Sequence, residues 1–232
     1  MSYPGVYKRL LVYGDSFCAS GGRNQVRDWV ADSWCDLLAA RLNIPCYVYG
    51  VGGTGPMEMV YTLHSHVAEG MILPTDIVLC SYSDPNRYCL TLDTGALNRT
   101  EPYESDKHPW LQSIIKRAGL ECTVDRFIQS LQLFQVYLDN KSRHDRIGIS
   151  TMRALDSIAE ELPCPVLFRH SFGNQRTQQR ELNYKFRHAV QLDGDMVDYM
   201  SVTDVPRTNH YNQAESQRVS KLFYDDIVAH VR

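Results

Sequence analysis

The stretch that decides the fold is Leu10-Leu-Val-Tyr-Gly-Asp-Ser-Phe17, an apolar run that passes directly into Gly14-Asp15-Ser16. The apolar part predicts a buried strand over Leu10–Tyr13, because a short apolar run bounded by turn residues is typical of a covered parallel sheet. Gly14 permits a tight turn where this strand ends. Ser16 is therefore expected at the carboxyl end of a strand, which is where open α/β sheets bind ligands.

Strands and amphipathic helices alternate along the rest of the chain. This order implies right-handed crossovers, and it predicts one domain over residues 1–232 with a mainly parallel sheet covered on both faces. An irregular insertion is expected at about 84–122, after a strand's carboxyl end. Further strands are predicted over Cys46–Tyr49, Asp76–Tyr82, Pro165–Phe168 and Met196–Val202, and helices up to Leu42, over about Pro56–Glu69, and around Phe127–Leu138, Leu155–Leu162 and Val219–Ile227.

Composition excludes several classes of protein. The 232 residues are 44% hydrophobic with a net charge of −3, which allows a sizeable core and argues against a nucleic-acid-binding protein. No apolar run is long enough to span a membrane, and the N-terminal residues lack a signal-peptide pattern. Seven scattered cysteines without a Cys-x-x-Cys pair favour a reducing compartment, so we expect a cytoplasmic protein without a metal.

Ser16 is the residue best placed for chemistry. A serine hydroxyl is a poor nucleophile alone, so it needs a base and a pocket that stabilises an oxyanion. The structural alternative is that Asp15 or Ser16 only caps the turn. Residues elsewhere in the chain decide between these two interpretations.

Three short blocks resemble the SGNH, or GDSL, hydrolase family. The first is the Gly-Asp-Ser-Phe stretch that ends at Phe17, and the second is Tyr49-Gly-Val-Gly-Gly-Thr54. The third, Thr208-Asn-His-Tyr-Asn-Gln-Ala214, is similar to the family's His-Pro-Asn stretch. The resemblance implies a three-layer α/β/α fold of SGNH-hydrolase-like (flavodoxin-like) type. It also implies a nucleophile at Ser16, a base at His210 and an oxyanion-binding backbone N–H at Gly53.

The chain departs from the family pattern at two places. Ser83, in Ser81-Tyr82-Ser83-Asp84, stands where the family has an asparagine that donates to the oxyanion. A hydroxyl also donates one hydrogen bond, and Asn86 is the alternative donor if the loop folds back. Arg207 occupies the position of the triad aspartate, so Asp204 is the nearest candidate acid, and a Ser–His dyad is the alternative.

Together these features predict a serine esterase that hydrolyses a short acyl or O-acetyl ester, with a carbohydrate as one candidate for the alcohol that carries it. The predicted partner is a small-molecule or glycan ester, with no cofactor, nucleic acid or membrane, and the oligomeric state is left open. One alternative is a non-catalytic carbohydrate-binding or structural module on the same fold. Another is a dinucleotide-binding protein that uses Gly50–Gly55, which satisfies Gly-x-Gly-x-x-Gly but needs an acid at the end of the next strand.

Overall fold

The computed structural model is an α/β domain whose central sheet is entirely parallel. The residues it describes are 7–18, 33–52, 54–83, 87–89, 96–98, 111–117, 119–137, 141–171, 184–200 and 211–231. The prediction of a three-layer α/β/α fold with a mainly parallel sheet is confirmed.

The sheet has five strands in the order β2-β1-β3-β6-β7. Leu10 of β1 lies opposite Cys46 on one side and Ile77 on the other, so β1 is an interior strand. Every residue of β3 is buried, as expected for a strand covered on both faces. The strands are β1 (Arg9–Tyr13), β2 (Cys46–Val48), β3 (Asp76–Tyr82), β6 (Val166–His170) and β7 (Val190–Gln191).

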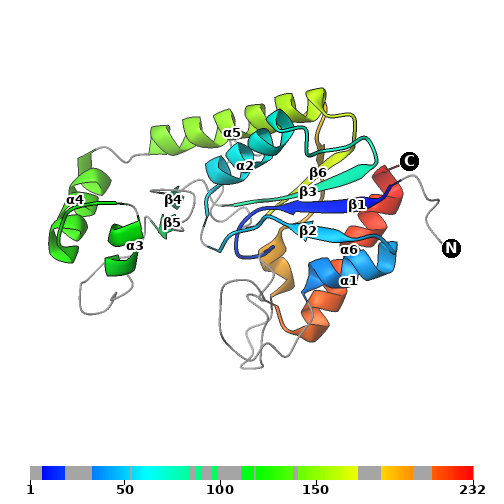
Figure 1. The fold of residues 1–232 in the computed structure, drawn as a ribbon, viewed down its shortest axis with the longest axis horizontal. Coiled ribbons are helices and arrows are strands. Elements are labelled where there is room, and N and C mark those ends of the chain that lie inside the picture. The colour runs from blue at the N-terminus through cyan, green and yellow to red at the C-terminus, as the bar shows by residue number, and fades with distance from the viewer. Residues whose placement is uncertain are drawn as a thin grey trace.

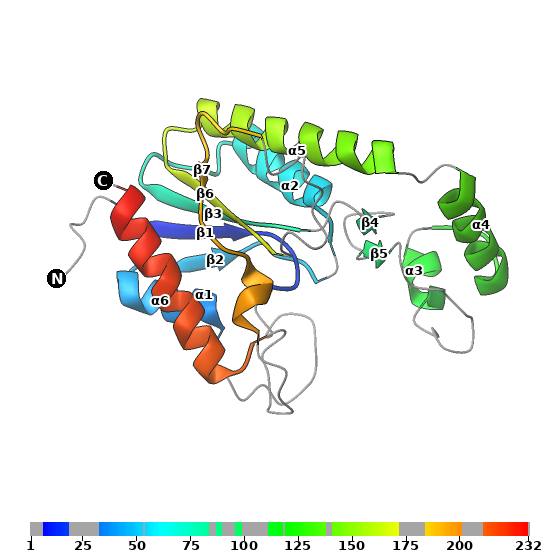
Figure 2. The ribbon, with the colours of Figure 1, turned by 180° about the vertical axis from the view of Figure 1, so that it is seen from behind.

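Helices cover both faces of the sheet. In Figures 1 and 2, α2 and α5 lie on one face, and α1 and α6 lie on the other. Helix α1 ends at Leu42 as predicted, and Asn43 follows it in the left-handed conformation, with φ of 54°, which is a common way for a helix to end. The helices are α1 (Trp34–Leu42), α2 (Pro56–Ala68), α5 (Lys141–Glu161) and α6 (Gln213–His230).

Alternate residues of the strands supply two separate cores. Leu10 and Val12 of β1 pack toward α1 and α6, where Trp34 stacks on Phe223 at 4.6 Å between ring centroids. Leu11 and Tyr13, which point to the other face of the sheet, pack toward α2 and α5. Each large apolar side chain that is buried contributes about 1.5–3 kcal/mol to the stability of the fold. The two cores therefore hold the strands in place, and with them the strand ends that carry the candidate site.

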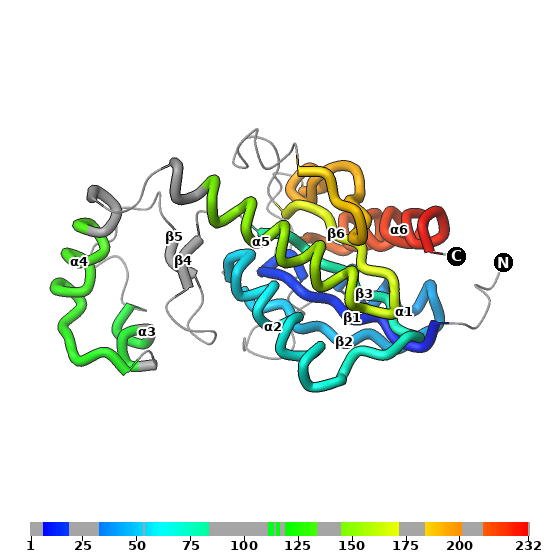
Figure 3. Tube along the Cα trace, turned by 90° about the horizontal axis from the view of Figure 1, so that it is seen from above, coloured from blue at the N-terminus to red at the C-terminus, as the bar shows by residue number. Residues whose placement is uncertain are grey.

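A smaller group of elements lies beyond the carboxyl edge of the sheet. Helices α3 (Leu111–Arg117) and α4 (Val124–Tyr137) pack on each other through Leu111, Ile115, Phe127 and Ile128. Figure 3 shows them beyond one end of α5. Strands β4 (Arg87–Cys89) and β5 (Ala96–Asn98) form an antiparallel pair. The sequence did not indicate α3, β4 or β5, which fall inside the segment expected to be irregular.

One predicted strand is wrong. Met196–Val202 was expected to be the last strand, but Met196–Tyr199 forms a 3₁₀ helix, η1. Asp195 and Asp198 cap this turn reciprocally, and only Met196 is fully buried, so the segment has no row of alternating buried residues. The fifth strand is instead the two-residue β7, which is too short to produce a period in the sequence.

Candidate active site

The turn after β1 requires a glycine at its first position. Gly14 has φ of +153°, and a Cβ added there would lie 2.7 Å from Cβ and 2.8 Å from the carbonyl oxygen of Ser81. Side chains essentially never pack that closely, and the conformation is rare for residues with a Cβ. The backbone of the turn therefore presses against β3 in a way that only glycine allows.

Asp15 holds the turn from inside. Its carboxyl group is fully buried and accepts from the backbone N–H of Phe17 at 3.0 Å and from the hydroxyl of Ser171 at 3.2 Å. The capping role that the sequence offered to Asp15 or Ser16 thus belongs to Asp15. Ser16, the next residue, is only partly buried.

The loop after β2 packs against the same turn. The carbonyl oxygen of Gly14 accepts from the N–H of Val51 at 3.1 Å, and it lies 3.3 Å from the hydroxyl of Thr54, which is 2.8 Å from the carbonyl oxygen of Val51. A Cβ built on Gly52 would lie 3.9 Å from the Cβ of Ser16. The first and second sequence blocks are therefore in contact, although Gly53 itself lies outside the described residues.

The segment that precedes α6 also reaches this turn. The ring of Tyr211 lies 5.7 Å from the ring of Phe17, and its hydroxyl donates to the carbonyl oxygen of Met196 at 2.6 Å. Asn212 then caps α6 through the N–H of Glu215. The residues that directly follow Ser16 and His210 in the chain thus touch each other.

Four of the predicted site residues are outside the described part of the chain. These are Gly53, Asn86, Asp204 and His210, and Arg207 lies there too. Ser83 is described at the carboxyl end of β3, where it is 2% exposed. Its hydroxyl has no hydrogen-bond partner among the described residues.

Asp76, the candidate acid for dinucleotide binding on the next strand, is not at the carboxyl edge of the sheet. Asp76 begins β3, at the opposite edge from Gly50–Gly55, and accepts from the guanidinium of Arg9 at 2.6 and 2.8 Å. It also accepts from the N–H of Leu73 at 2.7 Å. Asp76 is therefore occupied in joining β1 to β3 and is not placed to bind a ribose.

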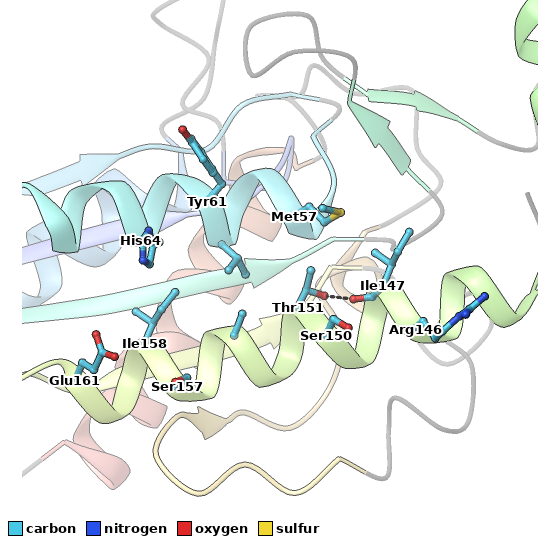
Figure 4. Close-up of a pocket in the computed structure, with 12 residues that line it drawn as sticks. Met57, Tyr61, His64, Arg146, Ile147, Ser150, Thr151, Ser157, Ile158 and Glu161 are labelled. Atoms are coloured by element: carbon cyan, nitrogen blue, oxygen red, sulfur yellow. Dashed lines mark hydrogen bonds between the residues drawn. The ribbon is translucent and has the colours of Figure 1, made fainter.

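A cavity of about 660 Å³ lies between α2 and α5. Figure 4 shows its lining residues along the two helices, with Met57 and Ile147 near one end and His64 and Glu161 near the other. None of its lining residues is a predicted site residue.

Among the described residues, no cluster of three or more His, Cys, Asp or Glu side chains is arranged to hold a metal ion. No helix within the described ranges is both long enough and apolar enough to cross a membrane.

Comparison with known proteins gives similarity to solved structures only. No family model matches the chain, and no curated protein matches its sequence. A protein from Bacillus subtilis is similar with a TM-score of 0.47 at 11% identity, over 96% of this chain and 56% of that protein, so this chain spans little more than half of its length.

Two other similar structures are of nearly the same length as this chain. A lipase/acylhydrolase from Enterococcus faecalis has a TM-score of 0.43 at 11% identity, covering 97% of each chain. An acetyl xylan esterase has a TM-score of 0.42 at 10% identity, covering 94% of this chain and 99% of that one. A further match bears the G-D-S-L family name that the first block resembles. Since every TM-score is below 0.5, the function is argued from this chain's own residues.

Proposed function

We propose that the protein is a serine hydrolase that cleaves a carboxylic ester through an acyl-enzyme on Ser16. The observation that carries this proposal is the contact between the rings of Phe17 and Tyr211 at 5.7 Å. Each of these residues directly follows a residue of the proposed pair, Ser16 and His210. Packing of the core does not by itself require a serine and a histidine at these two positions.

In the proposed reaction, the hydroxyl of Ser16 attacks the ester carbonyl while His210 accepts its proton. The backbone N–H groups of Ser16 and Gly53 stabilise the oxyanion, together with Ser83 or Asn86. His210 then returns the proton to the leaving alcohol, and water attacks the acyl group to regenerate Ser16. Asp204 orients the imidazole.

The buried Ser83 hydroxyl supports its proposed role. It lies at the carboxyl end of β3, has no partner among the described residues, and so retains a donor for an oxyanion. A buried hydroxyl without a partner costs free energy, so such a group is more often kept where a ligand satisfies it.

The proposed substrate is a short acyl or O-acetyl ester, and a carbohydrate is a candidate for the alcohol that carries the acyl group. The proposed location is the cytoplasm. The six cysteines whose side chains the structure describes are free thiols, which agrees with a reducing compartment.

The test is hydrolysis of p-nitrophenyl acetate by the wild type and by Ser16→Ala and His210→Ala. Each variant is expected to lose at least about a hundredfold in kcat/KM without a change in melting temperature. Ser150→Ala, a serine exposed on α5, is the control and should retain wild-type activity. Wild-type rates in Ser16→Ala would contradict the proposal, and a folded but inactive wild type would favour a non-catalytic module.

A further inference from the structure

Ser171 is a buried residue to which the sequence assigned no role. It follows β6 directly and is 0% exposed. We propose that Ser171 is a positioning residue that orients the turn carrying Ser16 through the carboxyl group of Asp15. This proposal rests on the proposed function of Ser16 and adds a residue to it.

The contacts form a chain from the sheet to the turn. The hydroxyl of Ser81 lies 2.5 Å from the hydroxyl of Ser171, which donates to the carboxyl group of Asp15 at 3.2 Å. The same carboxyl oxygen accepts from the N–H of Phe17 at 3.0 Å. Asp15, which precedes Ser16, therefore joins Ser171 to Phe17, the residue that follows Ser16.

The single hydrogen of each hydroxyl decides which group donates in these hydrogen bonds. A serine hydroxyl has one hydrogen to donate, and Ser171 uses it on Asp15. The hydrogen between Ser81 and Ser171 must then come from Ser81, so Ser171 accepts from Ser81 and donates to Asp15. The bond to Asp15 is consequently made by the hydroxyl of Ser171 and not by that of Ser81.

The main chain of Ser171 is fixed on both sides. Its N–H donates to the carbonyl oxygen of Tyr82 at 2.8 Å, and its carbonyl oxygen accepts from the N–H of Val197 in η1 at 2.9 Å. In η1, Met196 accepts from Tyr211, the neighbour of His210. One residue thus connects the turn that carries Ser16 with the segment that leads to the predicted base.

The experiment compares Ser171→Ala with Ser81→Ala. Both changes remove one buried hydroxyl from the same 2.5 Å pair. Only Ser171→Ala breaks the bond to Asp15. We expect it to lower kcat on p-nitrophenyl acetate about tenfold to a hundredfold with KM unchanged, and Ser81→Ala to lower it less than threefold. Ser171→Thr keeps the hydroxyl and should restore most of the rate.

Hydrogen exchange of the Phe17 amide gives a readout that does not need activity. We expect at least tenfold faster exchange in Ser171→Ala and wild-type exchange in Ser81→Ala. Equal effects of the two variants on kcat and on exchange, or none in either, would overturn the positioning role. If the wild type has no esterase activity, the proposed function fails, and the exchange of Phe17 still decides whether Ser171 holds the turn.

Discussion

Replacing Gly14 by alanine should destabilise the protein much more than the same change at Gly70. Both glycines have positive φ, +153° and +67°, so both variants incur the backbone cost of about 1 kcal/mol. At Gly70 nothing lies within 4 Å of the added Cβ, whereas at Gly14 it would lie 2.7 Å from the Cβ of Ser81. Relief of this overlap needs a shift of β3 or of the turn, which costs a further 1–3 kcal/mol or so.

The assay is urea unfolding of the wild type and both variants, with melting temperatures measured in parallel. We expect Gly14→Ala to lose about 2 kcal/mol more than Gly70→Ala, which corresponds to a melting temperature lower by about 4–8 °C for a chain of this size. Esterase activity should fall in Gly14→Ala and stay unchanged in Gly70→Ala. Equal losses of stability in the two variants would refute the close approach of the turn to β3.

Two further predictions concern buried ionisable groups near the sheet. Burial lowers the pKa of His170 from 6.5 to about 4. As the pH falls, the unfolded chain therefore binds a proton at this histidine before the folded protein does. About 3 kcal/mol of the free energy of unfolding that is present above pH 6.5 should be lost as the pH falls to 4. His170→Phe should flatten this part of the pH profile of unfolding, and an unchanged profile would refute it. Asp226→Ala should cost about 2–3 kcal/mol, because Asp226 pairs at 2.5 Å with the fully buried guanidinium of Arg169. Asp225→Ala breaks only an exposed pair, so it should cost less than about 0.5 kcal/mol in the same urea titration, and equal costs would contradict the role of Asp226.

The regular elements of the fold could be predicted because burial produces a period in the sequence. Asp76–Tyr82 matches β3 at both ends, since a strand covered on both faces is a continuous apolar run. The weaker elements could not be predicted. A run of four residues such as Met196–Tyr199 fits a strand or a helical turn equally well, and β7 has only two residues.

The candidate site could be predicted only where the residues lie in a local motif. Gly14 and Asp15 stand in one turn, so the need for a glycine and a capping carboxyl group there follows from neighbouring residues. Ser171 contacts Asp15 from 156 positions away in the sequence, and no local pattern indicates such a contact. The roles of Ser16, His210 and Gly53 stay predictions, and the last two residues are outside the described part of the chain.

The most direct test of the central claim is to treat the folded protein with a fluorophosphonate serine probe and to map the adduct by mass spectrometry. We predict one adduct, on Ser16, that forms at least about a hundredfold more slowly in His210→Ala, because the histidine accepts the serine's proton. An adduct on a different serine, or no adduct on the folded wild type, would contradict the account.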